Sequence, residues 1–233
     1  MTSRPEPGPA LVAVPGLGLR PTAWDTTLAA LPGHRSRTEV LPGYGVRPRR
    51  GEALDPATRG LRLAAVLQPE DGPVVLLGHS AGAQVVAHAA AAAADRVVGL
   101  VLVGPSTDPR ARTWPALAGR WLRTARHERP GQVPFLAWSY SRTGLLHIQR
   151  TMDAARHDDV EATLVDVRCP VLVLRGRHDR ICPADWAGRL VAAAPAGSRV
   201  ETLPAGARMV PLTHGPQVAA AVAAYLRADV SGA

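Results

Sequence analysis

A serine flanked by glycines stands between an apolar run and a helical pattern. The segment reads Gly78-His79-Ser80-Ala81-Gly82, after the apolar residues 74–77 and before residues 83–88. Gly-x-Ser-x-Gly between a strand and a helix is typical of a nucleophile elbow, a sharp turn that lifts the serine hydroxyl out of a sheet. The glycines permit a close approach of strand and helix, and the helix N-terminus favours negative charge. The spacing therefore predicts that Ser80 can attack a carbonyl carbon.

Three further segments carry motifs that accompany such a serine: Val12-Ala-Val-Pro-Gly-Leu-Gly18, Leu41-Pro-Gly-Tyr-Gly45 and Val171-Leu-Val-Leu-Arg-Gly-Arg-His-Asp-Arg-Ile-Cys-Pro183. With the elbow, they make the chain resemble the α/β-hydrolase superfamily from Leu11 to Leu226. The resemblance implies an oxyanion hole made by the backbone amides of Leu17 and Ala81. It also implies that Asp179 is the acid of a catalytic triad.

The segment that should supply the catalytic base departs from the family pattern. It reads Leu203-Pro-Ala-Gly-Ala-Arg-Met-Val-Pro-Leu212, so Arg208 stands where the family has histidine. A guanidinium group stays protonated in proteins and cannot take a proton from a serine hydroxyl. We expect Arg208 to pair with Asp179 through two parallel hydrogen bonds, and to leave a positive charge near Ser80.

Other histidines are candidates for the missing base. His214, six residues after Arg208, is the first candidate, although the ungapped match places it at the start of the last helix. His79 and His178 flank the nucleophile and the acid, where side chains tend to point away from the cleft. Three histidines could reach down from a cap: His127, His147 and His157. Cys182 is expected to be an apolar filler rather than a nucleophile.

Three functions follow from this set of residues. The first is a lyase, cyclase or bond-forming enzyme of biosynthesis, acting on a small carbonyl metabolite through Arg208 and the oxyanion amides. The second is a serine ester or thioester hydrolase that uses His214 or a cap histidine as its base. The third is a ligand-binding protein without catalysis. In each case we expect Arg208, Gly16 and His79 to contact the ligand, and we expect no metal and no cofactor.

The elements that must position these residues alternate along the chain. Short β-branched runs are expected to form strands at residues 10–14, 38–41, 74–78, 97–103, 171–175 and 199–203, with helices between most of them. This order is typical of a parallel sheet covered by helices on both faces. We predict an α/β fold, the α/β-hydrolase fold, with about six strands. One helix is expected after Pro183 and the last after Gly215-Pro216.

No strand pattern occurs between Ser106 and Val167. This segment instead contains amphipathic stretches rich in arginine and tryptophan. An insertion at the carboxyl ends of parallel strands lies over the ligand crevice. We therefore predict one domain, residues 1–233, with a helical cap formed by residues 106–167. A plain helical layer with a solvated charged face is the alternative.

Composition limits the partners. Hydrophobic residues at 46% and charged residues at 20% exclude disorder for most of the 233-residue chain. The net charge of +8 comes with arginine as the only cation and without a recognition motif, so we expect no nucleic acid and instead a small-molecule substrate, anionic or carrier-bound. Two cysteines, no apolar run that spans a bilayer, and a proline-rich start without a signal-peptide pattern lead us to expect a cytoplasmic protein without membrane contact.

Overall fold

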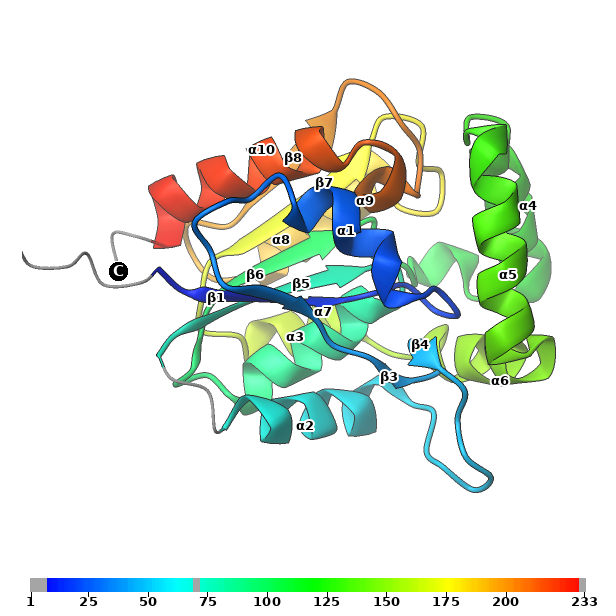
Figure 1. The fold of residues 1–233 in the computed structure, drawn as a ribbon, viewed down its shortest axis with the longest axis horizontal. Helices are drawn as coiled ribbons and strands as arrows, with labels where there is room; N and C mark the ends of the chain where they lie inside the picture. The colour runs from blue at the N-terminus through cyan, green and yellow to red at the C-terminus, as the bar shows by residue number, and fades with distance from the viewer. Residues whose placement is uncertain (1–7, 69–71, 231–233) are drawn as a thin grey trace, which may run out of the picture.

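A computed structural model describes residues 8–68 and 72–230 of the chain. Within these residues, six parallel strands form one sheet in the order β2-β1-β5-β6-β7-β8 (Figure 1). The strands are β1 (Ala10–Val14), β2 (Ser36–Thr38), β5 (Val74–His79), β6 (Val97–Val103), β7 (Val171–Gly176) and β8 (Arg199–Leu203). The predicted α/β-hydrolase fold with about six strands is confirmed.

Helices cover both faces of the sheet (Figure 1). One face carries α2 (Pro56–Leu67), α3 (Gly82–Ala92), α7 (Val160–Val165) and α8 (Ala184–Ala193); the other carries α1 (Asp25–Leu28), α9 (Val210–Thr213) and α10 (Gly215–Tyr225). The central strands β5 and β7 are fully buried along their length because apolar side chains on both of their faces meet helices. The helices expected after Pro183 and at Gly215 are both present.

One strand prediction was wrong. A strand was expected at residues 38–41, whereas β2 ends at Thr38 and Leu41 belongs to a separate pair, β3 (Leu41–Pro42) with β4 (Gly45–Val46). The reason is local. Gly43 has a φ of +86°, and the turn that it permits brings Leu41 within hydrogen-bonding distance of Tyr44 and away from the main sheet.

The segment between β6 and β7 is helical. It contains η2 (Pro109–Ala111), α4 (Trp114–Ala125), η3 (Pro130–Gln132), α5 (Val133–Thr143), α6 (Leu145–Ala155) and α7. Helices α4, α5 and α6 stand beyond one end of the sheet (Figure 1), whereas α7 packs against α3 and α8. We use the name cap for residues 114–155, which form α4 to α6.

Residues 1–7, part of the N-terminal stretch considered above, lie outside the described residues. Within the described ranges, no helix has the length and apolar character needed to cross a membrane.

Candidate active site

Ser80 occupies a sharp turn between β5 and α3. Its φ is +59°, in the left-handed region that non-glycine residues rarely adopt, and its amide donates to the carbonyl of Val103 at 2.9 Å. A Cβ on Gly78 would lie 2.6 Å from the Cα of Ala83, and one on Gly82 would lie 2.4 Å from the carbonyl oxygen of Pro15. The glycines of the motif are therefore sterically required, and the turn has the geometry of a nucleophile elbow.

Arg208 reaches from the loop after β8 and lies between the serine and the acid. Its Nη2 donates to Oγ of Ser80 at 2.6 Å, and its Nη1 donates to Oδ2 of Asp179 at 3.3 Å. The expected contact with Asp179 is present, but the two parallel hydrogen bonds are not. The guanidinium divides its donors between the two side chains because it fills the space between them.

Asp179 is held by the backbone of its own loop. Its Oδ1 accepts from the amides of Ile181 at 2.9 Å and Cys182 at 3.0 Å. The buried Arg175 donates to the carbonyls of Asp179 and Cys182 at 3.0 and 2.7 Å. Sequence reasoning did not single out Arg175, although a charged residue inside an otherwise apolar strand was a signal. Burial raises the pKa of the Cys182 thiol, which agrees with an apolar filler rather than a nucleophile.

His79 lies beneath Ser80 and is almost fully buried. Its Nε2 donates to the carbonyl of Arg208 at 3.0 Å, because a carbonyl can only accept. Burial, and then the positive charge of Arg208, lower the pKa of His79 to about 3. The imidazole is therefore neutral at pH 7 and is a weak base.

The resemblance assigned two backbone amides to an oxyanion hole, those of Leu17 and Ala81. Within the described part of the chain, neither the Leu17 amide nor the Ala81 amide donates to a protein group. Gly16 lets the backbone before Leu17 approach the elbow closely. A Cβ on Gly16 would lie 2.9 Å from Nδ1 of His79 and 3.2 Å from Cβ of Ser80. This packing explains why position 16 requires glycine.

His214 does not line the cavity that contains Ser80. Arg129 donates to its Nε2 at 3.5 Å, so Nδ1 carries the proton and donates to Thr213 at 2.8 Å. Burial, and then Arg129, lower the pKa of His214. The ring therefore stays at the start of α10 with both nitrogens engaged, and Arg208 takes the position beside Ser80.

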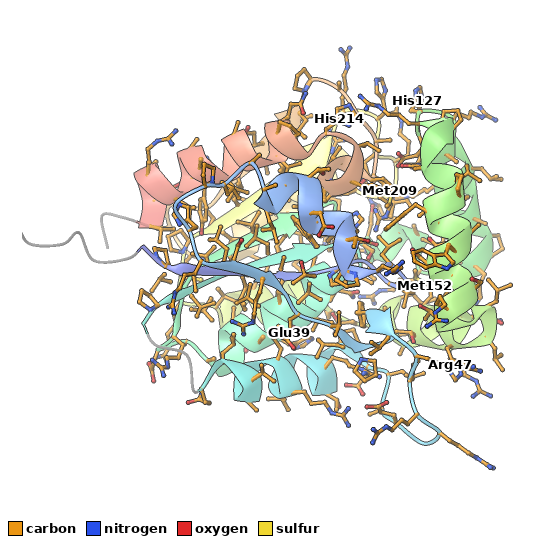
Figure 2. All side chains as sticks on the ribbon, viewed as in Figure 1. Glu39, Arg47, His127, Met152, Met209 and His214 are labelled. Atoms are coloured by element: carbon orange, nitrogen blue, oxygen red, sulfur yellow. The ribbon has the colours of Figure 1, made fainter. Side chains whose placement is uncertain are left out.

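None of the remaining candidate histidines lines the cavity that contains Ser80. His127, at the end of the cap helix α4, stacks on His178 with ring centroids 4.3 Å apart. His157 contacts the carbonyl of Asp153 on the surface, and His147 lines a different cleft. Figure 2 shows His127 and His214 at one edge of the molecule, with Met209 and Met152 nearer the space between the sheet and the cap. None of these histidines is hydrogen-bonded to Ser80 in the described structure.

Glu128 joins the cap to the loop that carries Arg208. Its Oε1 accepts from the backbone amides of Arg208 at 2.7 Å and Met209 at 3.0 Å. Its Oε2 accepts from the side chain of Gln132 at 3.1 Å. No local pattern in the sequence pointed to this contact, because Arg208 and Met209 lie 80 and 81 residues from Glu128.

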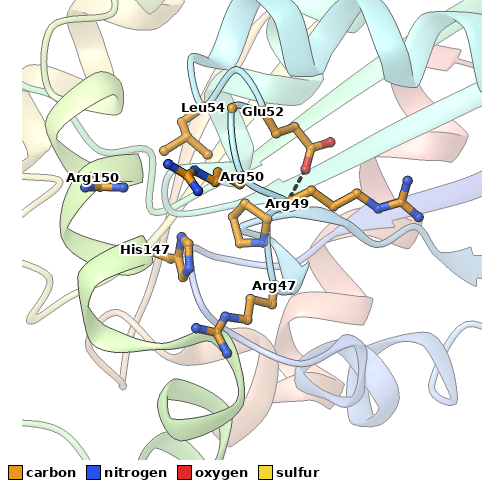
Figure 3. Close-up of a pocket in the computed structure, with 9 residues that line it drawn as sticks. Arg47, Arg49, Arg50, Glu52, Leu54, His147 and Arg150 are labelled. Carbon is orange, nitrogen blue, oxygen red and sulfur yellow. Dashed lines mark hydrogen bonds between the residues drawn. The ribbon is translucent and has the colours of Figure 1, made fainter.

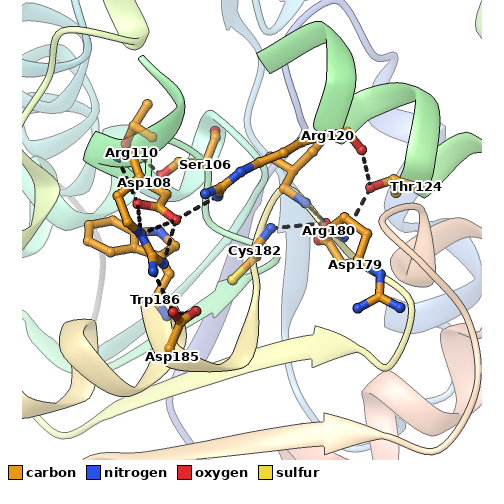
Figure 4. Close-up of polar contacts among 12 residues, drawn as sticks. Ser106, Asp108, Arg110, Arg120, Thr124, Asp179, Arg180, Cys182, Asp185 and Trp186 are labelled. Carbon is orange, nitrogen blue, oxygen red and sulfur yellow. Dashed lines mark hydrogen bonds and ion pairs between the residues drawn. The ribbon is translucent and has the colours of Figure 1, made fainter. Parts of the chain in front are cut away.

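A second set of polar contacts joins α4 to the core (Figure 4). Asp108, buried after β6, pairs with Arg110 at 2.8 Å and with Arg120 of α4 at 2.6 Å. Burial opposes ionisation of this carboxyl, but the hydrogen bonds from the two arginines outweigh it and lower the pKa of Asp108 to about 2. In addition, the amide of Arg180 donates to Thr124 of α4 at 3.0 Å. These contacts hold the cap beside the loop that carries Asp179.

The cap and the carboxyl ends of the strands enclose a cavity of about 830 Å³. Its polar lining residues come from both the core and the cap: His79, Ser80, Ser106, Thr124, Glu128, Arg129, Gln132, Gln149 and Arg208. Its apolar lining comes mainly from the cap and includes Trp114, Leu117, Trp121, Leu136, Leu145, Ile148 and Met152. A cavity with so much apolar lining can accept an extended apolar group. No group of three His, Cys, Asp or Glu side chains that could hold a metal occurs among the described residues.

The comparisons agree with this geometry. Residues 11–225 match the model of the alpha/beta hydrolase family. The chain belongs to that family. The family predicted from the motifs is thereby confirmed, and its members named below support an enzyme in general.

Two curated relatives are esterases. The chain is 37% identical to the pimeloyl-[acyl-carrier protein] methyl ester esterase of Aromatoleum aromaticum over 214 residues, 76% of this chain and 84% of that protein. It is 28% identical to the human palmitoyl-protein thioesterase ABHD10 over 114 residues, which is 48% of this chain and 36% of that protein. The second alignment thus spans about a third of its relative's length.

Solved structures share the fold. A hydrolase from Oleispira antarctica superposes with a TM-score of 0.76 at 13% identity, covering 95% of this chain and 92% of that one. The enol-lactonase of Burkholderia xenovorans LB400 superposes with a TM-score of 0.69 at 22% identity, covering 94% and 92%. At these identities the likeness extends to the fold alone.

Proposed function

We propose that the protein is an acyl hydrolase that cleaves thioesters and other acyl compounds with good leaving groups. Ser80 is the nucleophile, and the amides of Leu17 and Ala81 bind the oxyanion. The observation that carries the proposal is the 2.6 Å hydrogen bond from Arg208 to the hydroxyl of Ser80, two residues that line a largely apolar cavity. Esterase and thioesterase relatives support this hydrolytic function better than the lyase or cyclase that we favoured from the sequence.

The acyl chain lies in the apolar part of the cavity. Its carbonyl carbon then meets Ser80, and its oxygen meets the two amides. A cavity volume of about 830 Å³ holds a medium-length chain with room for part of the leaving group. The substrate is thus an extended acyl compound rather than an acetate ester.

Arg208 changes the chemistry at Ser80. Its positive charge stabilises the alkoxide form of the serine, but it cannot accept the proton, which leaves to hydroxide in solvent. The alkoxide forms a bond to the acyl carbon, the carbon–sulfur bond breaks, and the thiol leaves as thiolate. Hydroxide from solvent then adds to the acyl-serine, the carbon–oxygen bond to Ser80 breaks to give the alkoxide that Arg208 stabilises, and the carboxylic acid leaves and loses its proton to solvent. Without a general acid, an alkyl alkoxide leaves slowly, whereas a thiolate needs no proton.

The test compares S-ethyl thiooctanoate with ethyl octanoate, which carry the same acyl chain. We expect kcat/KM for the thioester to exceed that for the ester by about 100-fold, since general acid catalysis of alkoxide departure contributes at least that much and is missing here. The rate should also rise steadily between pH 6 and 9, roughly tenfold per unit, because no imidazole titrates. Ser80→Ala, the matched control, should abolish turnover of both substrates.

Equal preference for the two substrates, or a pH profile that levels off with an inflection near 7, would show that an imidazole base is at work. Either result would contradict the proposed role of Arg208.

The second candidate is a lyase, cyclase or bond-forming enzyme, and one observation favours it. A fixed guanidinium beside two free amides can bind a substrate carboxylate, phenolate or enolate. Such an enzyme needs no covalent serine intermediate. Turnover of a candidate metabolite that persists in Ser80→Ala would support this function over acyl hydrolysis.

A further inference from the structure

A second cleft, of about 320 Å³, lies on the far side of the cap helix α6 from Ser80. Its walls are the segment after β4 and one face of α6, and its lining includes Arg47, Arg50, His147 and Arg150 (Figure 3). None of these residues takes part in the site described above.

Helix geometry separates the two hollows. Successive residues of an α-helix are rotated by about 100°, so residues spaced by three or four share a face. Leu145, Ile148 and Met152 line the Ser80 cavity, whereas His147 and Arg150 line the cleft. The helix α6 is therefore a wall with an apolar cavity on one face and a cationic cleft on the other.

The positive charge in the cleft is not balanced by protein. Within the described chain, no carboxylate forms an ion pair with Arg47, Arg49, Arg50 or Arg150. Glu52 is the one acidic residue in the lining, and its carboxylate already contacts the Arg62 side chain and the amide of Arg49. Figure 3 shows the Arg49 side chain directed away from Arg50 and Arg150, with only its backbone amide bonded to Glu52.

We propose that this cleft binds a phosphate or diphosphate group carried by a small molecule. Three arginines, Arg47, Arg50 and Arg150, face one space that lacks a free carboxylate. Guanidinium groups bind phosphate oxygens through pairs of N–H donors, and several of them together favour a multiply charged anion over a single carboxylate. The volume of the cleft accommodates a diphosphate with water around it. This proposal stands independently of the reaction at Ser80.

The experiment is a calorimetric titration of the full chain with inorganic pyrophosphate at low salt. Saturable binding is expected, and the double variant Arg50→Gln with Arg150→Gln should bind at least about tenfold more weakly, a change of roughly 1.4 kcal/mol. The matched control is Arg123→Gln with Arg126→Gln. It removes the same charge from exposed positions of α4 that line neither hollow, and it should bind like the native protein.

An absence of saturable binding, or an equal loss of affinity in both double variants, would overturn the proposal. Equal loss would mean that pyrophosphate responds to net charge alone. Circular dichroism of each variant, recorded before titration, verifies that the comparison is made between folded proteins.

A second arm distinguishes the sources of the phosphate. Octanoyl coenzyme A carries a diphosphate and a thioester, and it is titrated into Ser80→Ala so that no turnover occurs. One outcome is that octanoyl coenzyme A binds more tightly than pyrophosphate and that Met152→Trp, in the cavity, weakens its binding. This outcome would mean that the phosphates in the cleft belong to a substrate whose acyl chain lies in the Ser80 cavity, on the other face of α6. Affinity equal to that of pyrophosphate and unaffected by Met152→Trp assigns the phosphate to a free anion that acts as an effector.

Discussion

The carboxylate of Glu128, on the cap, accepts a 2.7 Å hydrogen bond from the backbone amide of Arg208, on the core. The same oxygen accepts from Met209. The position of the guanidinium beside Ser80 therefore depends on a residue that sequence motifs do not mark. A change in the cap can alter the site without a change in any residue that contacts the serine.

Replacing Glu128 should destabilise the native state. Glu128→Ala leaves two partly buried amides without an acceptor, so we expect the free energy of unfolding to fall by about 1–3 kcal/mol. Glu128→Gln retains one carbonyl oxygen and should cost less. Urea denaturation measures both. Glu161→Ala, which removes a surface partner of Arg189, is the control and should cost no more than about 1 kcal/mol. Equal losses for Glu128→Ala and Glu161→Ala would contradict the role of the cap contact.

Arg208→His should introduce a base beside Ser80. We expect hydrolysis of p-nitrophenyl acetate to rise by at least about tenfold over the native protein near pH 7.5, because an imidazole can take the serine proton where a guanidinium cannot. The gain should disappear in Arg208→His with Ser80→Ala. Robust Ser80-dependent hydrolysis by the native protein, with no gain in Arg208→His, would contradict this prediction.

His214→Ala should leave acyl hydrolysis within about twofold of the native rate. The basic nitrogen of His214 accepts from Arg129 rather than from Ser80, so its removal takes nothing from the reacting atoms. The assay is thioester turnover by purified protein at pH 8. A loss of about 100-fold or more, the scale of general base catalysis, would identify His214 as the base and make Arg208 incidental.

The buried His79 should make stability fall with acid. Its pKa is about 3 in the native state and near 6.5 in an unfolded chain, so the unfolded state binds one more proton between those values. The free energy of unfolding should therefore decrease by up to about 1.4 kcal/mol for each pH unit below 6.5. Urea denaturation at pH 7 and 5.5 measures the slope.

Two variants separate this effect from general acid denaturation. His79→Gln can still donate to the carbonyl of Arg208 and should flatten the slope. His157→Gln, an exposed site, should leave it unchanged. A steep slope that persists in His79→Gln would assign the pH dependence to other groups.

The parts of the site that depend on local pattern could be predicted from the sequence. The elbow at Ser80 follows from two glycines between a buried strand and a helix, and Arg208 could be placed at the base position because the matching segment has no gap. The strand expected at residues 38–41 failed because a turn at Gly43 withdraws Leu41 from the sheet. That turn is local, because its hydrogen bonds join Leu41 and Tyr44, so the error came from extending the strand into a segment that already carried a turn motif.

Contacts between distant segments were beyond prediction. The division of Arg208 between Ser80 and Asp179 depends on the space left where three loops meet. The cationic cleft joins arginines of residues 47–50 with Arg150, and the sequence showed these only as scattered charges among many arginines. Tertiary packing decides which charges come together, whereas composition reports only their sum.

The positive φ of Ser80 lowers the stability of the fold, although the serine hydroxyl is needed for the proposed reaction. Holding a non-glycine side chain in the left-handed region costs about 1–3 kcal/mol, which the packing of β5 and α3 must offset. Glycine would relieve that cost but would remove the hydroxyl. Selection for thermal stability alone would therefore favour loss of the Ser80 hydroxyl, so stabilised variants should be screened with position 80 held fixed.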